Sequence, residues 1–357
     1  MTGPREQFRP DDHDNDHFLL TSVVGSYPKP KWHDRARELF EDEDADFDRD
    51  NWEESKDDAA KLITEEHEHS GLDTVVDGEM RRNEMVEYFA ELIDGYEFNG
   101  RVKVWGHNYF DKPSIADEVE YDEEWLVDEY EFTSSVTDRP VKVPITGPYT
   151  LARWAFNEAY ETTEEATYAL ADLVNEEIDR LVDAGCKYIQ IDEPALAQYE
   201  DDHAIVGEAL ERIVDGIPDD VRVGLHVCYG DYSRIYPEIL DYPVHEYDLE
   251  LANGDYEQLD VFKSEEFTKD FAMGVVDVHV AEVESVQEIK DNIKKGLEVV
   301  PPEQLTVSPD CGVKLLPREV AYGKMENMVQ AAREIEQELD AGEIDVVASG
   351  AEASADD

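Results

Sequence analysis

Eight short runs of apolar, mostly β-branched residues recur along the chain, and stretches with helical periodicity separate them. Runs of this length and composition predict buried strands. The runs occupy residues 19–26, 72–79, 141–147, 187–193, 221–229, 244–251, 271–279 and 304–312. The clearest helical stretches are residues 51–69, 84–95, 164–184, 283–297 and 318–341. Strands that alternate with helices form parallel βαβ units, and eight such units close a (β/α)8 TIM barrel of the α/β class. A doubly wound open sheet is the alternative architecture.

The 357 residues suit one large barrel with insertions as well as they suit two domains. Residues 97–139 interrupt the alternation of strands and helices, which predicts an insertion or lid. Residues 1–17 lack apolar periodicity, and residues 343–357 are mostly small and acidic. We therefore expect a single barrel over residues 18–342, between a flexible N-terminal segment and a flexible acidic tail.

The balance of charge restricts the partners of this chain. It has 31 Lys and Arg against 90 Asp and Glu, a net charge of −59. Such a surface repels phosphates, so nucleic acid and anionic membranes are excluded as partners. The acids are spread over helical faces, which is typical of halophilic proteins, where salt screens self-repulsion over about 3 Å at 1 M. No apolar run reaches the roughly 18 residues of a membrane span, and no secretory leader precedes the first run, so we expect a cytoplasmic protein.

Reactive side chains gather where the apolar runs end. In a βα barrel the active site lies at the carboxyl ends of the strands. The residues that end the eight runs are, in order, Gly25 and Ser26, Glu79, Thr146 and Gly147, Asp192 and Glu193, His226 and Cys228, Glu250, His279, and Cys311. These positions therefore predict one shared site at the barrel rim.

Four of these residues form a plausible metal site. His226 and Cys228 end one run, and Glu250 and Cys311 end the next and the last. One imidazole, one carboxylate and two thiolates suit tetrahedral Zn²⁺. Zinc with two thiolates is a weak Lewis acid toward water, yet it can hold an incoming thiol as a nucleophilic thiolate, which suits alkyl transfer to sulfur.

Each of these residues also has a simpler interpretation. A lone buried cysteine or histidine belongs to a core more often than to a metal site, and this is our interpretation of Cys186. Carboxylates are abundant in this chain, so His245, Glu246 or Asp248 could replace Glu250 as the fourth ligand.

Eight sequence strings resemble, in the same order, the C-terminal catalytic barrel of cobalamin-independent methionine synthase. The resemblance runs from about residue 20 to about residue 340, and the chain is similar in length to the short archaeal forms. The strings are TSVVGSYPKP, VVDGEMRRNEMVEYFAELIDGY, ITGPYTLARWAF, YIQIDEPALAQ, LHVCY, the glutamate of YDLELA, VVDVHVAEV and VSPDCGVKLLP.

The resemblance implies zinc-dependent methyl transfer from a 5-methyltetrahydrofolate-type pterin to homocysteine, which yields methionine. It assigns zinc ligation to His226, Cys228, Glu250 and Cys311. It also implies roles for other residues of the rim: homocysteine binding by the backbone of Gly25 and Ser26 with Glu79 and Asp192, donor stacking by Trp154, and proton donation by His279.

Elementary chemistry agrees with several of these roles. Glu79 and Asp192 can pair with the substrate ammonium, although Asp192 could instead cap a helix before Pro194. Trp154 lies in an apolar helical segment and could equally be a core residue. Displacement at a methyl group on a tertiary amine needs a protonated nitrogen, and His279 is a suitable general acid.

Three departures from the family concern the methyl donor. The long members carry an additional N-terminal barrel that helps hold the folate tail, and this chain is too short for it. Asn108 and Tyr109 stand near the position of a donor-contacting arginine, and Gln198 stands where a glutamate recognises the pterin. A separate polypeptide could supply the missing barrel.

Three alternatives to the folate-dependent reaction therefore remain. The donor could be methylcobalamin or a corrinoid protein, and the acceptor could be coenzyme M or another thiol. A non-catalytic alternative is a structural-zinc subunit of a split enzyme, which four saturated protein ligands would favour.

Overall fold

A computed structural model describes residues 7–10, 17–42, 44–104 and 108–344, with the backbone alone for 101–104 and 108–110. Seven parallel strands form its main sheet, in the order β1-β10-β9-β8-β7-β6-β4. Their bounds are β1 Leu20–Thr21, β4 Lys142–Thr146, β6 Tyr188–Asp192, β7 Arg222–Val227, β8 Glu246–Leu249, β9 Asp270–Gly274 and β10 Leu305–Ser308. Each strand lies within one of the predicted apolar runs, except that β9 begins one residue before its run.

The remaining run closes the sheet into a barrel. The Asp73 N–H donates to the Thr21 carbonyl of β1 at 3.2 Å, and the Lys142 N–H of β4 donates to the Val75 carbonyl at 2.8 Å. Val75 also forms a parallel bridge with Val141. The segment from Asp73 to Val75 therefore takes the eighth position between β1 and β4, and the predicted α/β barrel fold is confirmed.

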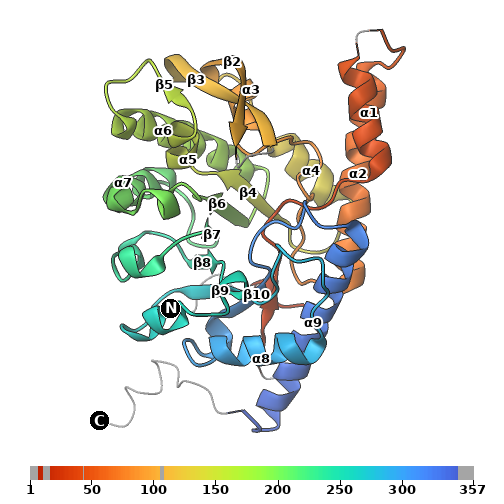
Figure 1. The fold of residues 1–357 in the computed structure, drawn as a ribbon, viewed down its shortest axis with the longest axis vertical. Coiled ribbons are helices and arrows are strands. Elements are labelled where there is room, and N and C mark those ends of the chain that lie inside the picture. Colours follow the sequence, from red (N-terminus) through yellow and green to blue (C-terminus); the bar gives the residue numbers. More distant parts are fainter. Residues whose placement is uncertain (1–6, 11–16, 43, 105–107, 345–357) are drawn as a thin grey trace.

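Helices follow the strands and surround the sheet (Figure 1). Their bounds are α1 Lys31–Glu41, α2 Arg49–Ser70, α3 Glu87–Leu92, α4 Val127–Ser135, α5 Pro148–Arg153, α6 Thr163–Asp183, α7 His203–Ile213, α8 Val286–Gly296 and α9 Arg318–Asp340. Local signals explain where several begin and end. Asp48 accepts the Asn51 N–H before α2, Gly71 takes the left-handed conformation (φ 87°) after it, and Ser285 and Glu288 form a capping box on α8.

An antiparallel hairpin accounts for the predicted insertion at 97–139. It consists of β2 (Asp94–Val104) and β3 (Asn108–Glu120), and β5 (Phe156–Asn157) adds a short parallel pairing to β3. Figure 1 shows the hairpin at one end of the molecule, next to α3. The hairpin and α4 thus fill the predicted interruption, whereas a lid function stays a prediction. Most of the flexible ends predicted at 1–17 and 343–357 lies outside the described residues. Residues 7–10 are described, and there Phe8 is buried and its ring contacts Tyr188, so this part of the predicted flexible segment packs on the barrel.

Polar side chains fill the part of the barrel interior where the strands begin. The Tyr188 hydroxyl of β6 donates to the Glu246 carboxylate of β8, and these strands are not neighbours, so the contact crosses the interior. Arg222 pairs with Glu246 at 2.7 Å and with Asp270 at 2.6 Å, and the Thr306 hydroxyl donates to Glu246 at 2.7 Å. Although burial opposes ionisation, Arg222 holds the pKa of Glu246 at about 2. Barrel interiors are usually filled by branched apolar residues, so this ionic layer is a particular feature of the chain.

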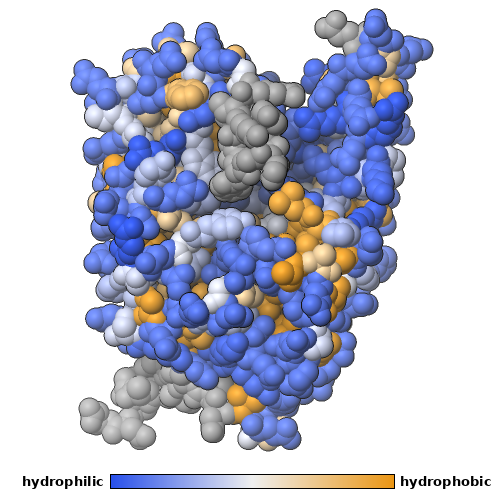
Figure 2. Space-filling view, viewed as in Figure 1, coloured by the Kyte–Doolittle hydropathy of each residue, from blue (hydrophilic) through white to orange (hydrophobic). Residues whose placement is uncertain are grey.

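The outer surface is predominantly hydrophilic. Figure 2 shows this for one face, where apolar side chains gather mainly near α9. Within the described segments, none of the helices combines the length and the apolar character that a membrane span requires.

Replacement of Arg222 by Met tests the ionic layer. The variant leaves the buried Glu246 and the half-buried Asp270 without their cation, so we expect the free energy of unfolding to fall by about 3–5 kcal/mol in denaturant titrations at fixed salt. Arg35→Met is the matched control, because Arg35 pairs with Glu38 but is two-thirds exposed (66%), and exposed pairs contribute little. Equal losses in the two variants would contradict this account.

Candidate active site

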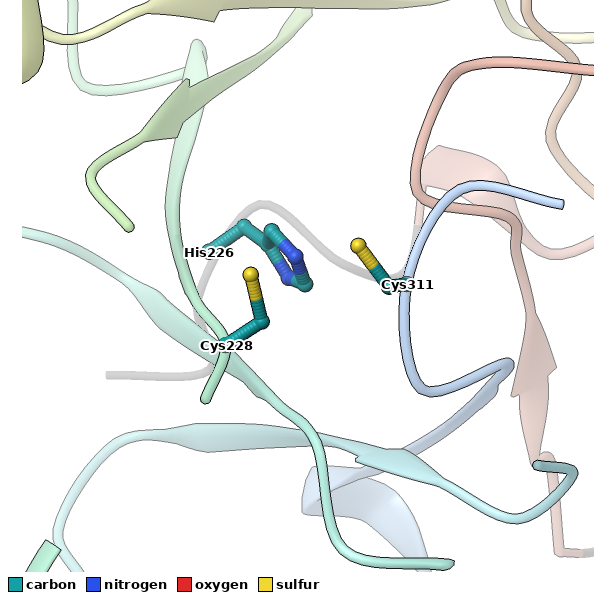
Figure 3. Close-up of side chains that lie close together, drawn as sticks. All are labelled: His226, Cys228 and Cys311. Atoms are coloured by element: carbon teal, nitrogen blue, oxygen red, sulfur yellow. The ribbon is translucent and has the colours of Figure 1, made fainter. Parts of the chain in front are cut away.

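Three predicted metal ligands converge at the barrel mouth. His226 lies near the end of β7, Cys228 follows that strand, and Cys311 lies in the loop after β10. One ligand atom from each lies within 4.8 Å of the other two. Figure 3 shows the three side chains pointing toward one another from two sides of the mouth. His226 and Cys228 are buried and Cys311 is half-buried, so bulk water has limited access to the group.

The position of Asp248 orients the His226 ring. His226 Nδ1 lies 3.1 Å from the Asp248 carbonyl oxygen and 3.4 Å from its carboxylate Oδ1. A proton on Nδ1 leaves the lone pair of Nε2 available as a ligand. Nε2 is buried and has no hydrogen-bond partner among the described residues. Buried polar atoms are rarely unpaired, so this orphaned nitrogen fits a metal ligand.

The two thiols are electrostatically unequal. The hydrogen bond between Cys228 and Cys311 lowers the pKa of Cys311, and His226 lowers it further. The same hydrogen bond raises the pKa of Cys228. Cys311 is therefore the sulfur whose thiolate is favoured over that of Cys228, and thiolate is the form of cysteine that binds metals.

Glu250 lies beside this group and is not part of it. One oxygen of its carboxylate accepts the Tyr229 N–H at 3.0 Å, and the other accepts from Asn253 Nδ2 at 2.9 Å. Its charge reaches the group, because it contributes to the raised pKa of Cys228. Asp310, which sequence reasoning did not single out, accepts the backbone N–H groups of residues 251–253 and so fixes the loop after Glu250.

None of the substitutes considered for Glu250 joins the three ligands either. His245 accepts the Val223 N–H through Nδ1. Glu246 pairs with Arg222 in the ionic layer. Asp248 lies behind His226, on the side of Nδ1.

The predicted amino-acid pocket adjoins Cys311. A Cβ added at Gly25 would lie 2.5 Å from Glu79 Oε1, and one added at Gly312 would lie 2.0 Å from Ser26 Oγ. Both glycines therefore permit close approaches that any larger residue would block. Glu79 itself has a left-handed backbone (φ 57°), which is unusual for this residue type. These contacts bring Gly25, Ser26 and Glu79 next to the cysteine loop.

Asp192 is a second buried acid near Glu79. Burial raises its pKa to about 7, and the charge of Glu79 adds to that rise. Burial likewise raises the pKa of Glu79. The charge of Glu79 therefore acts on Asp192, and this pair of acids is a candidate to bind a cation.

The neighbouring Glu193, and not Asp192, caps a helix, and that helix is α5 and not one that follows Pro194. It accepts the Tyr149 N–H at 2.9 Å and the Thr150 N–H at 2.8 Å at the start of α5. The side chain of Asp192 instead accepts from Gln190 Nε2 at 2.7 Å.

His279 contacts Tyr229 and Asp277. Its Nδ1 is 3.0 Å from Asp277 Oδ1, and its Nε2 is 2.7 Å from the Tyr229 hydroxyl. Tyr229 directly follows Cys228 and has a left-handed backbone (φ 62°). Sequence reasoning missed Tyr229, and its position one residue after a predicted ligand was the signal that could have identified it.

The residues expected to contact the donor are less closely associated with this group. Trp154 ends α5 and is half-buried against the core. Gln198 ends a short 3₁₀ helix (Leu196–Gln198) and is exposed. The side chains of Asn108 and Tyr109 lie outside the described residues.

Comparisons with known proteins agree with this geometry. A family model described as the catalytic domain of cobalamin-independent synthase matches residues 19–334. The chain is 41% identical over 328 residues to a methionine synthase of Sulfurisphaera tokodaii, covering 90% of this chain and 94% of that relative. It is 43% identical over 327 residues to a methionine synthase of Pyrococcus furiosus, with coverages of 90% and 94%. A B12-independent methionine synthase from Shewanella sp. W3-18-1, solved with selenomethionine, has a TM-score of 0.80 and 26% identity, covering 90% of this chain and 99% of that one.

The convergent ligands predict that the protein binds one thiophilic divalent ion. We expect Cys228→Ser and Cys311→Ser to lose most bound zinc, and to lose the thiolate-to-metal absorption of a cobalt-loaded sample. Cys186→Ser is the matched control, because Cys186 is buried away from the group and its thiol contacts the Tyr188 carbonyl. Metal analysis after dialysis against a chelator gives the result. Equal zinc content in all four proteins would contradict the prediction.

Proposed function

The chain belongs to the cobalamin-independent methionine synthase family, and from this premise we propose that it methylates homocysteine on a zinc site. His226, Cys228 and Cys311 would hold Zn²⁺, and Glu250 would be the fourth protein ligand. The donor would be a 5-methyltetrahydrofolate-type pterin. The observation that carries the proposal is the convergence of two thiols and one unpaired imidazole nitrogen beside two buried acids.

The donor set supports zinc. Imidazole and thiolate ligands are those that zinc prefers. When bound, Zn²⁺ with two thiolates would keep the substrate sulfur deprotonated and nucleophilic at neutral pH. Among the described residues only three ligands lie close together, so the fourth position, which Glu250 would take, would be open to exchange with the substrate thiol, as in catalytic zinc sites. This arrangement favours an enzyme over the structural-zinc alternative.

The amino-acid pocket supports homocysteine as the acceptor. Glu79 and Asp192 would pair with the substrate ammonium, which relieves the mutual repulsion of the two acids. The backbone around Gly25 and Ser26 would receive the substrate carboxylate, one loop away from Cys311. Coenzyme M has no ammonium group and would bring no cation to the two acids.

Proton delivery supports a pterin donor. His279 would protonate the amine that leaves with the donor, while Asp277 holds Nδ1 and so fixes the orientation of the ring. The Tyr229 hydroxyl contacts Nε2 and can pass the proton toward the mouth. Trp154 would stack on the donor ring. Transfer from methylcobalamin releases no amine and would not need this proton.

An assay with both donors tests the reaction. Zinc-loaded protein in concentrated KCl is incubated with homocysteine and either methyltetrahydrofolate or methylcobalamin, and methionine is measured by mass spectrometry. We expect methionine from methyltetrahydrofolate. Product from methylcobalamin alone would replace the pterin by the corrinoid donor. Product from neither would contradict methyl transfer by this chain on its own.

His279→Gln tests the proton donor separately. We expect the turnover rate with methyltetrahydrofolate to fall about 10²–10⁴-fold, because the amine must leave without a proton. Zinc content and homocysteine affinity are expected to stay unchanged. Glu282→Gln, an exposed position in the same loop, is the matched control. A turnover rate equal to that of the unmodified protein would exclude the acid role of His279.

A further inference from the structure

We propose that Lys142 is a positioning residue that orients both halves of the active site, the His226 ligand and the Asp192 carboxylate. The inference rests on the proposed function, since it assigns Lys142 to the same zinc and homocysteine sites. Lys142 begins β4 and is 1% exposed. Burial of a charged ammonium group away from water costs free energy, so the contacts of Lys142 show what it does in the barrel interior.

The ammonium of Lys142 lies between two side chains of the barrel interior. It donates to Gln190 Oε1 on β6 and lies 3.9 Å from Asp248 Oδ2 on β8. β4 and β8 are separated by two strands in the sheet, so the Lys142–Asp248 pair spans the interior. This pair lies between the ionic layer around Arg222 and the barrel mouth.

Asp248 connects Lys142 to His226. Its Oδ2 faces Lys142 and accepts the Ser308 hydroxyl at 3.2 Å, while its Oδ1 and carbonyl oxygen lie beside His226 Nδ1. Without the lysine, the Asp248 charge would be buried with only a hydroxyl and the imidazole near it. The carboxylate would then no longer be held in the orientation that directs Nε2 toward the cysteines.

Gln190 connects Lys142 to Asp192. An ammonium group can only donate hydrogen bonds, so the amide oxygen of Gln190 must face Lys142. The amide nitrogen is thereby directed to the other side, where it donates to Asp192 Oδ1 at 2.7 Å and to the Val24 carbonyl at 3.0 Å. Val24 precedes Gly25, so the contacts of Gln190 fix both the Asp192 carboxylate and the backbone that would bind homocysteine.

The contacts of Lys142 through Gln190 and through Asp248 make separate predictions. Gln190→Leu removes only the hydrogen bonds that connect Lys142 to Asp192, and Asp248→Asn changes only the contacts that connect Lys142 to His226. Lys142→Met removes the ammonium group from which both sets of contacts start. Zinc affinity, measured by competition with a chromophoric chelator, reports on the orientation of the His226 ligand. Binding of L-methionine, measured by calorimetry, reports on the amino-acid pocket and involves no free thiol.

We expect Lys142→Met to weaken zinc binding about 10–100-fold, the usual effect of losing an outer contact to a metal ligand, and to weaken methionine binding as well. Gln190→Leu is expected to weaken methionine binding alone. Adding Asp248→Asn to Lys142→Met removes the unpaired buried charge, so the double variant should recover zinc affinity without recovering methionine affinity.

Arg222→Met is the matched control for a merely structural role. Arg222 is an equally buried cation of the same barrel interior and lies in the ionic layer. We expect it to lower stability while zinc and methionine affinities stay unchanged. Equal binding by Lys142→Met and the unmodified protein would overturn the inference, as would equal losses in Lys142→Met and Arg222→Met.

Two further outcomes are decisive. If Lys142→Met does not fold, Gln190→Leu and Asp248→Asn test the inference instead. Unchanged methionine affinity in Gln190→Leu then overturns it. If the unmodified protein binds neither zinc nor methionine, the proposed function itself fails, which separates that failure from the failure of the Lys142 assignment.

Discussion

The pairing of charge inside the barrel is the constraint on which the rest of the structure depends. Water does not reach the interior side chains, so each buried cation needs carboxylates and each buried carboxylate needs donors. Arg222 meets this need for Glu246 and Asp270, and Lys142 meets it for Asp248. The Arg222–Asp270 and Lys142–Asp248 pairs connect strands that are not neighbours, so they also fix how the strands approach one another. A barrel filled by aliphatic residues would close equally well but could not orient polar groups at its mouth.

The same pairing gives the mouth its chemistry. Asp248 directs the His226 ring, and His226 in turn lowers the pKa of Cys311. The Asp277, His279 and Tyr229 side chains form a second polar row, and Tyr229 directly follows Cys228. Under the proposed function, Glu79 and Asp192 would bind an ammonium and this row would deliver a proton to the reaction at the soft ligands. Methyl transfer to a thiol needs these three elements together, and family membership indicates the same reaction.

Much of the fold could be predicted from the sequence, because strand and helix periodicities are local. All eight apolar runs became positions in the barrel, and the rim residues could be identified from where the runs end. The roles of residues inside the barrel could not be predicted in this way. Asp248 and Glu250 both alternate toward the interior, and the sequence does not show in which layer each lies, so Asp248 was considered as a ligand when it lies behind one. Lys142 and Gln190 were missed because a polar residue at the start or middle of a strand has no local signature.

The charges on the outer surface respond to salt differently from the charge pairs inside the barrel. The chain has a net charge of −59, and salt screens its exposed charges over about 3 Å at 1 M ionic strength. At low salt the surface would repel an anionic substrate from the barrel mouth, since the field of the whole protein acts over longer distances. The interior pairs are shielded from ions by the strands around them and change little with salt. Ionic strength should therefore act mainly on the approach of substrate, while the geometry of His226, Asp192 and their supporting side chains stays the same.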